Sequence, residues 1–272
     1  VITAACFVGF GLIKQSFFPN SNTPMFYVNY WLPQGSDIKV VSDDLSTAEQ
    51  FLKSDPATEA VSTFVGGAAT RYILTYDPES SNPSYGQLIV RAKDLESIPS
   101  LMDRLLKHMR QYNPDAQAFG KRMVFGPGAG AKLEVRFSGP DANTLRNLAG
   151  QAEEAFRADG RIRDIRDDWR ERELVLTPLF DEQRARIAGV LRSDLAETLQ
   201  LANDGLQVGS YRDGDETVPI IARAAKGERE NPETLPDRLV WSASQGAYVP
   251  LVQIVSSFET RAEDTLIHRR DR

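Results

Sequence analysis

The sequence contains 272 residues, which at about 150 residues per domain predicts two domains. Hydrophobic residues make up 41% and charged residues 26%, as in ordinary globular proteins, so a disordered or fibrous chain is excluded. Lys and Arg number 32 against 38 Asp and Glu, and the resulting net charge of −6 argues against a nucleic-acid-binding domain. The single cysteine, Cys6, excludes a disulfide framework and a thiolate metal site within the chain.

The chain opens on an apolar run, Val1–Ile13, with Lys14 as its first charge. The run is shorter than the roughly 20 residues that a membrane-spanning helix needs. It is either a buried core helix or the end of a transmembrane helix whose Lys14 and Phe17–Phe18 lie at the membrane interface. The far end, Ile267–Arg272, is charged and has no closing apolar element. We expect a fragment of a longer protein.

Strand and helix patterns alternate over the first part of the chain. β-Branched and aromatic runs predict strands at 25–32, 60–65, 71–76, 87–92 and 116–125. Apolar residues at helical spacing predict two helices. The helix at 38–52 has Ile38, Val41, Leu45, Ala48 and Leu52 on one face, and the helix at 97–112 has Ile98, Leu101, Leu105 and Met109. With 71–76 merged into the hairpin before 87–92, the order is β-α-β-β-α-β, the ferredoxin-like split βαβ motif.

The pattern then restarts. Alternating residues at 133–137 predict a half-buried strand, and Asp141 can cap a helix with an apolar stripe at Leu145, Leu148, Ala152 and Phe156. Strands at 162–165 and 173–176 complete β-α-β-β. A different block follows in place of the second α-β. Its predicted helices are 181–187 and 194–202, and its predicted strands are 207–211, 217–224, 238–242 and 247–254. We interpret this block as an insertion into the second unit.

Few residues could carry catalytic chemistry. The only histidines, His108 and His268, are far apart in sequence. The sequence has no H-E-x-x-H, paired-cysteine or G-x-S-x-G pattern, so it lacks the motifs that zinc enzymes and serine hydrolases require. We predict no enzyme, no catalytic residue and no cofactor.

Metal ligands are similarly sparse. Acidic pairs that could hold Mg²⁺ or Ca²⁺ occur at Asp43–Asp44, Asp167–Asp168 and Asp213–Asp215, where solvation is the simpler explanation. Four methionines could bind a soft metal: Met25, Met102, Met109 and Met123. Because Met102 and Met109 are seven residues apart, they fit one packed face of a helix. We predict no metal site.

Several segments occur in the order found in one transporter family. They are Phe17–Pro19, Leu32–Gly35, Leu88–Asp94, Phe137–Asp141, Arg161–Asp167, Arg184–Val190, Gly209–Asp215 and Gly246–Leu251. Together they resemble the second large periplasmic loop of resistance-nodulation-division (RND) efflux transporters, in the acriflavine-resistance or hydrophobe/amphiphile efflux branch. The resemblance extends from Phe17 to about Asp264. The run from Arg184 onward is its most specific part and is similar to the family's docking segment.

The resemblance implies an α+β fold of ferredoxin-like split βαβ porter subdomains, one complete and one partial, with an inserted mixed α/β docking subdomain. Residues 1–19 would be the truncated end of a transmembrane helix, and residues 20–127 the first porter subdomain. Residues 128–178 with 255–272 would be a partial second porter subdomain, and 179–254 the docking subdomain. We expect the isolated fragment to be monomeric or weakly associated, with an unpaired strand edge at 131–137 or 172–178.

The function implied by the resemblance is the periplasmic porter part of a proton-driven multidrug efflux pump in the bacterial inner membrane. The proton-relay residues would lie outside this chain. Implied partners are further copies in a homotrimer, a periplasmic adaptor protein, an outer-membrane channel and hydrophobic small molecules, with no nucleic acid. By family position, Tyr27, Phe64, Ile89, Phe125 and Arg166 would lie near the substrate path, although buried strands use the same apolar types in an ordinary core.

Two alternatives remain open. One is the metal-efflux branch of the same family, which transports ions of the Cu⁺ or Ag⁺ type and should bring Met and carboxylates together. The other is a stand-alone ferredoxin-like binding module, because that fold serves many functions. Residues Ala68–Arg71 also depart from the aromatic and Gly-rich residues that the family often has after Gly66–Gly67.

Overall fold

The computed structural model describes residues 20–71, 76–124, 131, 133–229 and 231–263. The described chain forms two compact units, unit 1 up to Glu173 and unit 2 from Leu174 to Glu263. Three predicted features lie outside the described residues: the helix end at 1–19, most of the strand at 71–76, and Phe125. The boundaries predicted for the three subdomains remain a prediction.

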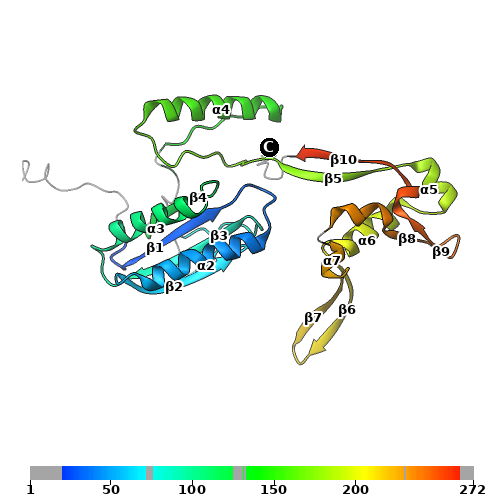
Figure 1. Cartoon of the computed structure of the whole chain (residues 1–272), viewed down its shortest axis with the longest axis horizontal. Coiled ribbons are helices and arrows are strands. Elements are labelled where there is room, and N and C mark those ends of the chain that lie inside the picture. Colours follow the sequence, from blue (N-terminus) through cyan, green and yellow to red (C-terminus); the bar gives the residue numbers. More distant parts are fainter. Residues whose placement is uncertain (1–19, 72–75, 125–130, 132, 230, 264–272) are drawn as a thin grey trace, which may run out of the picture. The chain divides into compact units, whose positions relative to one another are not determined.

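Unit 1 is built on a four-stranded antiparallel sheet with the strand order β2-β3-β1-β4 (Figure 1). The sheet and the two helices between its strands are, in chain order, β1 (Met25–Trp31), α2 (Ile38–Ser54), β2 (Thr58–Val65), β3 (Tyr85–Ala92), α3 (Ile98–Tyr112) and β4 (Gln117–Arg122). β1 pairs with both β3 and β4, and β3 pairs with β2. This order of strands and helices is the split βαβ arrangement predicted from the sequence.

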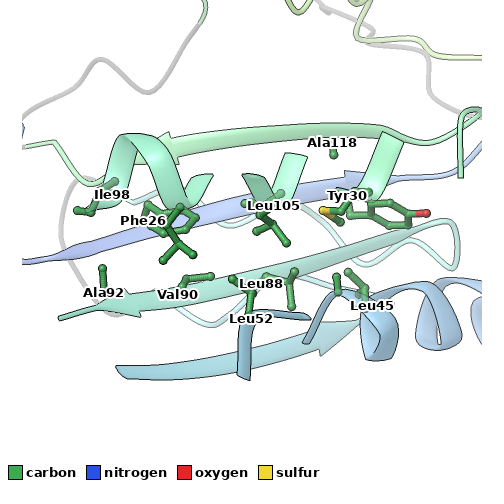
Figure 2. Packing of buried hydrophobic residues seen from close by; sticks show 14 of the residues in the cluster. Phe26, Tyr30, Leu45, Leu52, Leu88, Val90, Ala92, Ile98, Leu105 and Ala118 are labelled. Atoms are coloured by element: carbon green, nitrogen blue, oxygen red, sulfur yellow. The ribbon is translucent and has the colours of Figure 1, made fainter. Parts of the chain in front are cut away.

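One face of the sheet packs against both helices. Figure 2 shows side chains from β1 and β3, among them Phe26 and Val90, directed toward Leu45 and Leu52 of α2 and Leu105 of α3. All five of these side chains are fully buried. Strand residues reach this core from every second position, because successive side chains point to opposite faces of a sheet.

The predicted faces of α2 and α3 are confirmed with one exception. Val41, Leu45, Ala48 and Leu52 of α2 are buried, and so are the four residues predicted for α3, namely Ile98, Leu101, Leu105 and Met109. Ile38 was expected on the buried face of α2 but is 42% exposed. It stands in the first turn of the helix, beyond the edge of the packed core.

Residues 133–173 depart from the sequence prediction. The helix is present as α4 (Ala142–Asp159), with Asp141 Oδ2 accepting the Thr144 N–H at 2.7 Å and Gly160 ending it in the left-handed conformation. The strands expected at 133–137 and 162–165 are absent. Leu133 is 55% exposed, and no described strand pairs with its segment. An alternating sequence forms a strand only where a partner edge supplies hydrogen bonds, so that prediction was wrong.

Unit 2 contains three two-stranded sheets and several short helices (Figure 1). Its elements are β5 (Glu173–Phe180), α5 (Glu182–Ala188), α6 (Arg192–Ala202), β6 (Leu206–Asp213), β7 (Glu216–Ala222), α7 (Lys226–Arg229), η1 (Pro232–Asp237), β8 (Leu239–Ser242), β9 (Ala247–Pro250), η2 (Leu251–Gln253) and β10 (Val255–Glu263). β5 pairs with β10 along one edge, and no described strand pairs with its other edge, as predicted for 172–178.

A small core holds unit 2 together. Its fully buried members include Val240, Leu251 and Ile254. The two ends of the block predicted to be an insertion lie side by side, because the Asp181 N–H donates to the Ile254 carbonyl at 3.0 Å. The α+β fold class predicted from the sequence is confirmed by this architecture.

Candidate functional site

None of the described helices packs on the second face of the unit 1 sheet, which we call the helix-free face. Alternation along the strands assigns to it Met25, Tyr27, Asn29 and Trp31 of β1, Tyr85, Gln87, Ile89 and Arg91 of β3, Ser62 and Phe64 of β2, and Phe119, Lys121 and Met123 at β4. The face is rich in aromatic and aliphatic groups. Tyr27, Ile89 and Met123 form a buried cluster, against which Met25 and Phe64 pack.

The loop between β2 and β3 covers part of this face and is fixed by Gln87, which is 1% exposed. Gln87 Oε1 accepts the Ala69 N–H at 3.1 Å and the Tyr76 hydroxyl at 2.9 Å. Gln87 Nε2 donates to Asn29 Oδ1 at 2.9 Å. One amide therefore ties two points of the loop to two strands of the sheet.

The segment after α4 supplies a second cover. The guanidinium carbon of Arg170 lies 3.5 Å from the centre of the Trp31 ring, and that of Arg166 lies 4.6 Å from the centre of the Phe119 ring. Both distances are within the range of a cation–π interaction. The Arg170 backbone is left-handed, with φ of 55°, and its N–H donates to Asp167 Oδ1. This local turn aims Arg170 at the sheet.

Burial and like charge shape the electrostatics of the helix-free face. Burial raises the pKa of Tyr27 and Tyr85 above the ordinary value of 10. Burial also lowers the pKa of Arg170 to about 10, and the positive charge of Arg166 acts in the same direction. The pKa of Lys121 is lowered, first by burial and then by Arg166. The face therefore combines buried tyrosines with three cations, of which Arg166 is exposed to solvent.

The structure gathers four of the five residues predicted for the substrate path around this face. Tyr27, Ile89 and Phe64 share one cluster, and Arg166 stacks on the neighbouring Phe119. Phe125 lies outside the described residues. Tyr27 and Ile89 are 7% and 9% exposed, so a ligand could reach them only after the two covers moved.

Sequence reasoning missed other members of the same surface. The rings of Trp31 and Tyr85 contact each other at a tilt of 45°, with their centres 4.5 Å apart, beside the cluster that holds Tyr27. Their positions follow from those of Tyr27 and Ile89 by steps of two along each strand, so the alternation could have found them. Arg170 had no such signal, because its placement depends on an irregular turn.

The methionines divide between the two faces of the sheet. Met25 and Met123 belong to the cluster on the helix-free face. Met102 and Met109 pack in the core on the helix side, which agrees with the prediction of one helix face. In the part of the chain that the structure describes, no three or more His, Cys, Asp or Glu side chains are grouped closely enough to hold a metal ion. Asp44 instead accepts a hydrogen bond from the Tyr30 hydroxyl.

Within the described ranges, none of the helices combines the length and the hydrophobicity required to cross a membrane.

Comparison with known proteins gives a consistent result. No curated protein matches the sequence. Two crystal structures described as a heavy metal efflux pump match the fold, with TM-scores of 0.70 and 0.67 at 18% and 17% sequence identity. Each match covers 97% of this chain and 28% of the pump chain, so this chain spans little more than a quarter of those proteins. The model of the AcrB/AcrD/AcrF family matches residues 1–272, and the chain therefore belongs to the AcrB/AcrD/AcrF family.

Proposed function

We propose that this chain is the periplasmic porter and docking part of a proton-driven efflux pump in the bacterial inner membrane. In this proposal the pump exports hydrophobic or amphiphilic compounds. It belongs to the acriflavine-resistance branch of the family, which exports multiple drugs. The full-length protein would supply the transmembrane proton relay. It would work as a homotrimer with a periplasmic adaptor protein and an outer-membrane channel. Family membership and the fold match to efflux pumps support this assignment.

One observation favours amphiphilic substrates: the helix-free face is an aromatic and aliphatic surface closed by covers. Tyr27, Phe64 and Ile89 offer apolar area without a dense set of polar anchors. Surfaces of this composition accept compounds of varied shape, because most of the binding comes from apolar contact rather than from directed hydrogen bonds.

The covers are held by polar and apolar contacts together. The loop is tied by the two hydrogen bonds that Gln87 accepts and by the burial of Ala69 and Tyr76 in the cluster that holds Tyr27. The segment after α4 contacts aromatic rings through Arg166 and Arg170. In this proposal, movement of the covers would give a ligand access to Tyr27 and Ile89.

The test uses a bacterial host that lacks its own pumps and carries the full-length gene. Growth is measured against a panel of amphiphilic drugs for the Phe64→Ala and Arg166→Ala variants, with protein amounts checked by immunoblot. Arg163→Ala is the matched control, because Arg163 is exposed and lies on the same segment as Arg166. We expect each test variant to lower the inhibitory concentration about fourfold or more for some compounds, as loss of about 1 kcal/mol of contact would. If Arg166→Ala leaves resistance unchanged for every polar compound in the panel, the assignment of Arg166 to the substrate path is overturned.

A second candidate function is export of a soft metal ion such as Cu⁺ or Ag⁺. The observation that favours it is the shared cluster of Met25 and Met123, because thioether sulfur binds these ions. In the same host, the double variant Met25→Leu/Met123→Leu would abolish resistance to Ag⁺, whereas Met102→Leu/Met109→Leu would not. If the host that carries the unmodified gene is no more resistant to Ag⁺ than the host without it, this candidate is excluded.

A further inference from the structure

Asn29 is a partly exposed amide among the aromatic and aliphatic groups of the helix-free face. It lies on β1, opposite Gln87 of β3 and Phe119 of β4 in the registers of the sheet. Gln87 bonds the loop between β2 and β3, and Phe119 lies under Arg166 of the segment after α4. Asn29 therefore lies between the two covers of the face and is only partly covered by them.

A backbone donor sets the orientation of the Gln87 amide. The Ala69 N–H can only donate, and it lies 3.1 Å from the Gln87 amide, so the atom that faces it is the oxygen. The Tyr76 hydroxyl donates to the same oxygen at 2.9 Å. The Gln87 Nε2 group is therefore on the other side of the amide, and there it can only donate.

The Nε2 group of Gln87 sets the orientation of the Asn29 amide in turn. It donates to Asn29 Oδ1 at 2.9 Å, and the Tyr85 hydroxyl donates to the same oxygen at 3.0 Å. An amide oxygen accepts through two lone pairs, and both are used here. Asn29 therefore holds its oxygen toward Gln87 and Tyr85 and presents its Nδ2 group elsewhere.

The Asn29 Nδ2 group donates to no residue in the part of the chain that the structure describes. It is not a buried unpaired atom either, so it reaches solvent. Water can accept its hydrogen bonds in the free protein. A ligand without an acceptor would displace that water and leave the donor unpaired, whereas a ligand with an acceptor would replace the lost bond. One fixed donor on a mainly apolar surface thus discriminates between ligands.

We propose that Asn29 is a specificity-determining residue of the helix-free face, which selects amphiphiles that carry a neutral acceptor, such as a ketone, ester or amide carbonyl, on an aromatic body. This inference rests on the proposed function, because it narrows the substrate class of the same surface. The Asn29 Nδ2 group donates to the carbonyl oxygen, and the aromatic body contacts the apolar groups of the face.

The test uses the purified 272-residue chain and two ligands of the same shape, 2-acetylnaphthalene and 2-isopropenylnaphthalene. The second has a CH₂ group in place of the carbonyl oxygen, so it lacks the acceptor. A third ligand, (2-naphthylmethyl)ammonium, carries donors instead. The bound fraction is measured by equilibrium dialysis with naphthalene absorbance and the protein in excess. The affinity for the ketone divided by the affinity for the alkene is the acceptor preference.

The variant Asn29→Asp replaces the presented donor by an acceptor of the same shape. One carboxylate oxygen keeps the hydrogen bonds from Gln87 and Tyr85, and the other takes the place of Nδ2. We expect the acceptor preference to fall about fivefold or more, as loss of one neutral hydrogen bond would produce. The ammonium ligand should bind about tenfold more tightly, because its hydrogen bond to a carboxylate is charge-assisted.

Asn147→Asp is the matched control. Asn147 is exposed on α4, and its Oδ1 atom also accepts a side-chain amide N–H, from Gln151 at 3.2 Å. The control therefore introduces the same charge away from the helix-free face. It should leave the acceptor preference unchanged and should alter ammonium binding by less than about twofold, because salt screens a distant charge. Circular dichroism verifies that both variants are folded.

A second measurement needs no variant. In the ¹⁵N-labelled chain, the side-chain amide resonances of Asn29 should shift when the ketone is added and should shift much less with the alkene. The side-chain amide of Asn147 should stay in place with both ligands.

The outcomes separate this inference from the proposed function. Failure of all three ligands to bind would overturn the proposed substrate surface and the inference with it. Binding with the same acceptor preference in Asn29→Asp and Asn147→Asp would overturn only the inference. Equal shifts of the Asn29 amide with the ketone and the alkene would do the same, even if Asn29→Asp did not fold.

Discussion

The Gln87 side chain should contribute more to the stability of unit 1 than any other neutral polar group of the sheet. In Gln87→Leu, which keeps nearly the same volume, three hydrogen bonds are lost: those from the Ala69 N–H and the Tyr76 hydroxyl and the one to Asn29. At about 1 kcal/mol each, the free energy of unfolding should fall by about 3 kcal/mol. Ala69 is only 4% exposed, so its N–H would not regain a partner from water while the loop stays closed.

The assay is a urea titration read by hydrogen–deuterium exchange of peptides covering β1 and β3, which measures unit 1 separately from unit 2. With a urea slope of about 2 kcal/mol per M, the midpoint should fall by about 1.5 M. Gln117→Leu is the matched control on β4, because the Gln117 Oε1 atom is buried without a hydrogen-bond partner. Removing it should leave the midpoint unchanged or raise it. A Gln87→Leu midpoint within about 0.5 M of the control would refute the reasoning.

Three further predictions concern packing, pH and assembly. A Cβ atom at Gly86 would lie 2.3 Å from Leu45 Cδ1 and 2.9 Å from the Phe64 carbonyl oxygen, so Gly86→Ala should cost about 3 kcal/mol or more in the same titration, and a cost below about 1 would contradict the packing. Burial acts to raise the pKa of Asp55, but the Ala57 N–H that its carboxylate accepts and its ion pair with Arg104 hold the pKa below the ordinary value. The resulting stabilisation is complete above about pH 5 and is lost as the pH falls through the folded-state pKa, so Asp55→Asn should be destabilising at pH 7 and the difference should vanish in acid. Light scattering across a concentration series should give a monomer or weak association for the isolated chain, and a concentration-independent trimer would contradict this prediction.

Amphipathic patterns predicted the four-stranded sheet of unit 1 and the helices α2 and α3 because each has its packing partner there, whereas no residue of α4 in the same unit is buried. The spacing of Val41, Leu45 and Leu52 is a direct consequence of one helix lying on one sheet face. The same reasoning failed at Leu133 and Ile162. Strand formation there depends on a partner edge, and the alternation of side chains carries no information about whether one is present.

The candidate site was predictable where it lies on regular structure. Tyr27 and Ile89 belong to alternating strands, so their shared face follows from the sequence alone. Arg170 could not be placed in the same way. Its position depends on two left-handed residues, Asp164 and Arg170 itself, neither of which is a glycine. Such backbone conformations are set by tertiary contacts rather than by local preference.

The most direct test of a substrate surface on the helix-free face is methyl NMR of the chain labelled with ¹³C at its four methionine methyl groups. Met25 and Met123 lie in the cluster on that face, whereas Met102 and Met109 pack on the helix side of the same sheet and act as internal controls. Titration with the neutral ligand naphthalene-2-methanol should shift the resonances of Met25 and Met123 and leave the other two in place. Shifts confined to Met102 and Met109, or no shift in any of the four at saturating ligand, would contradict the account.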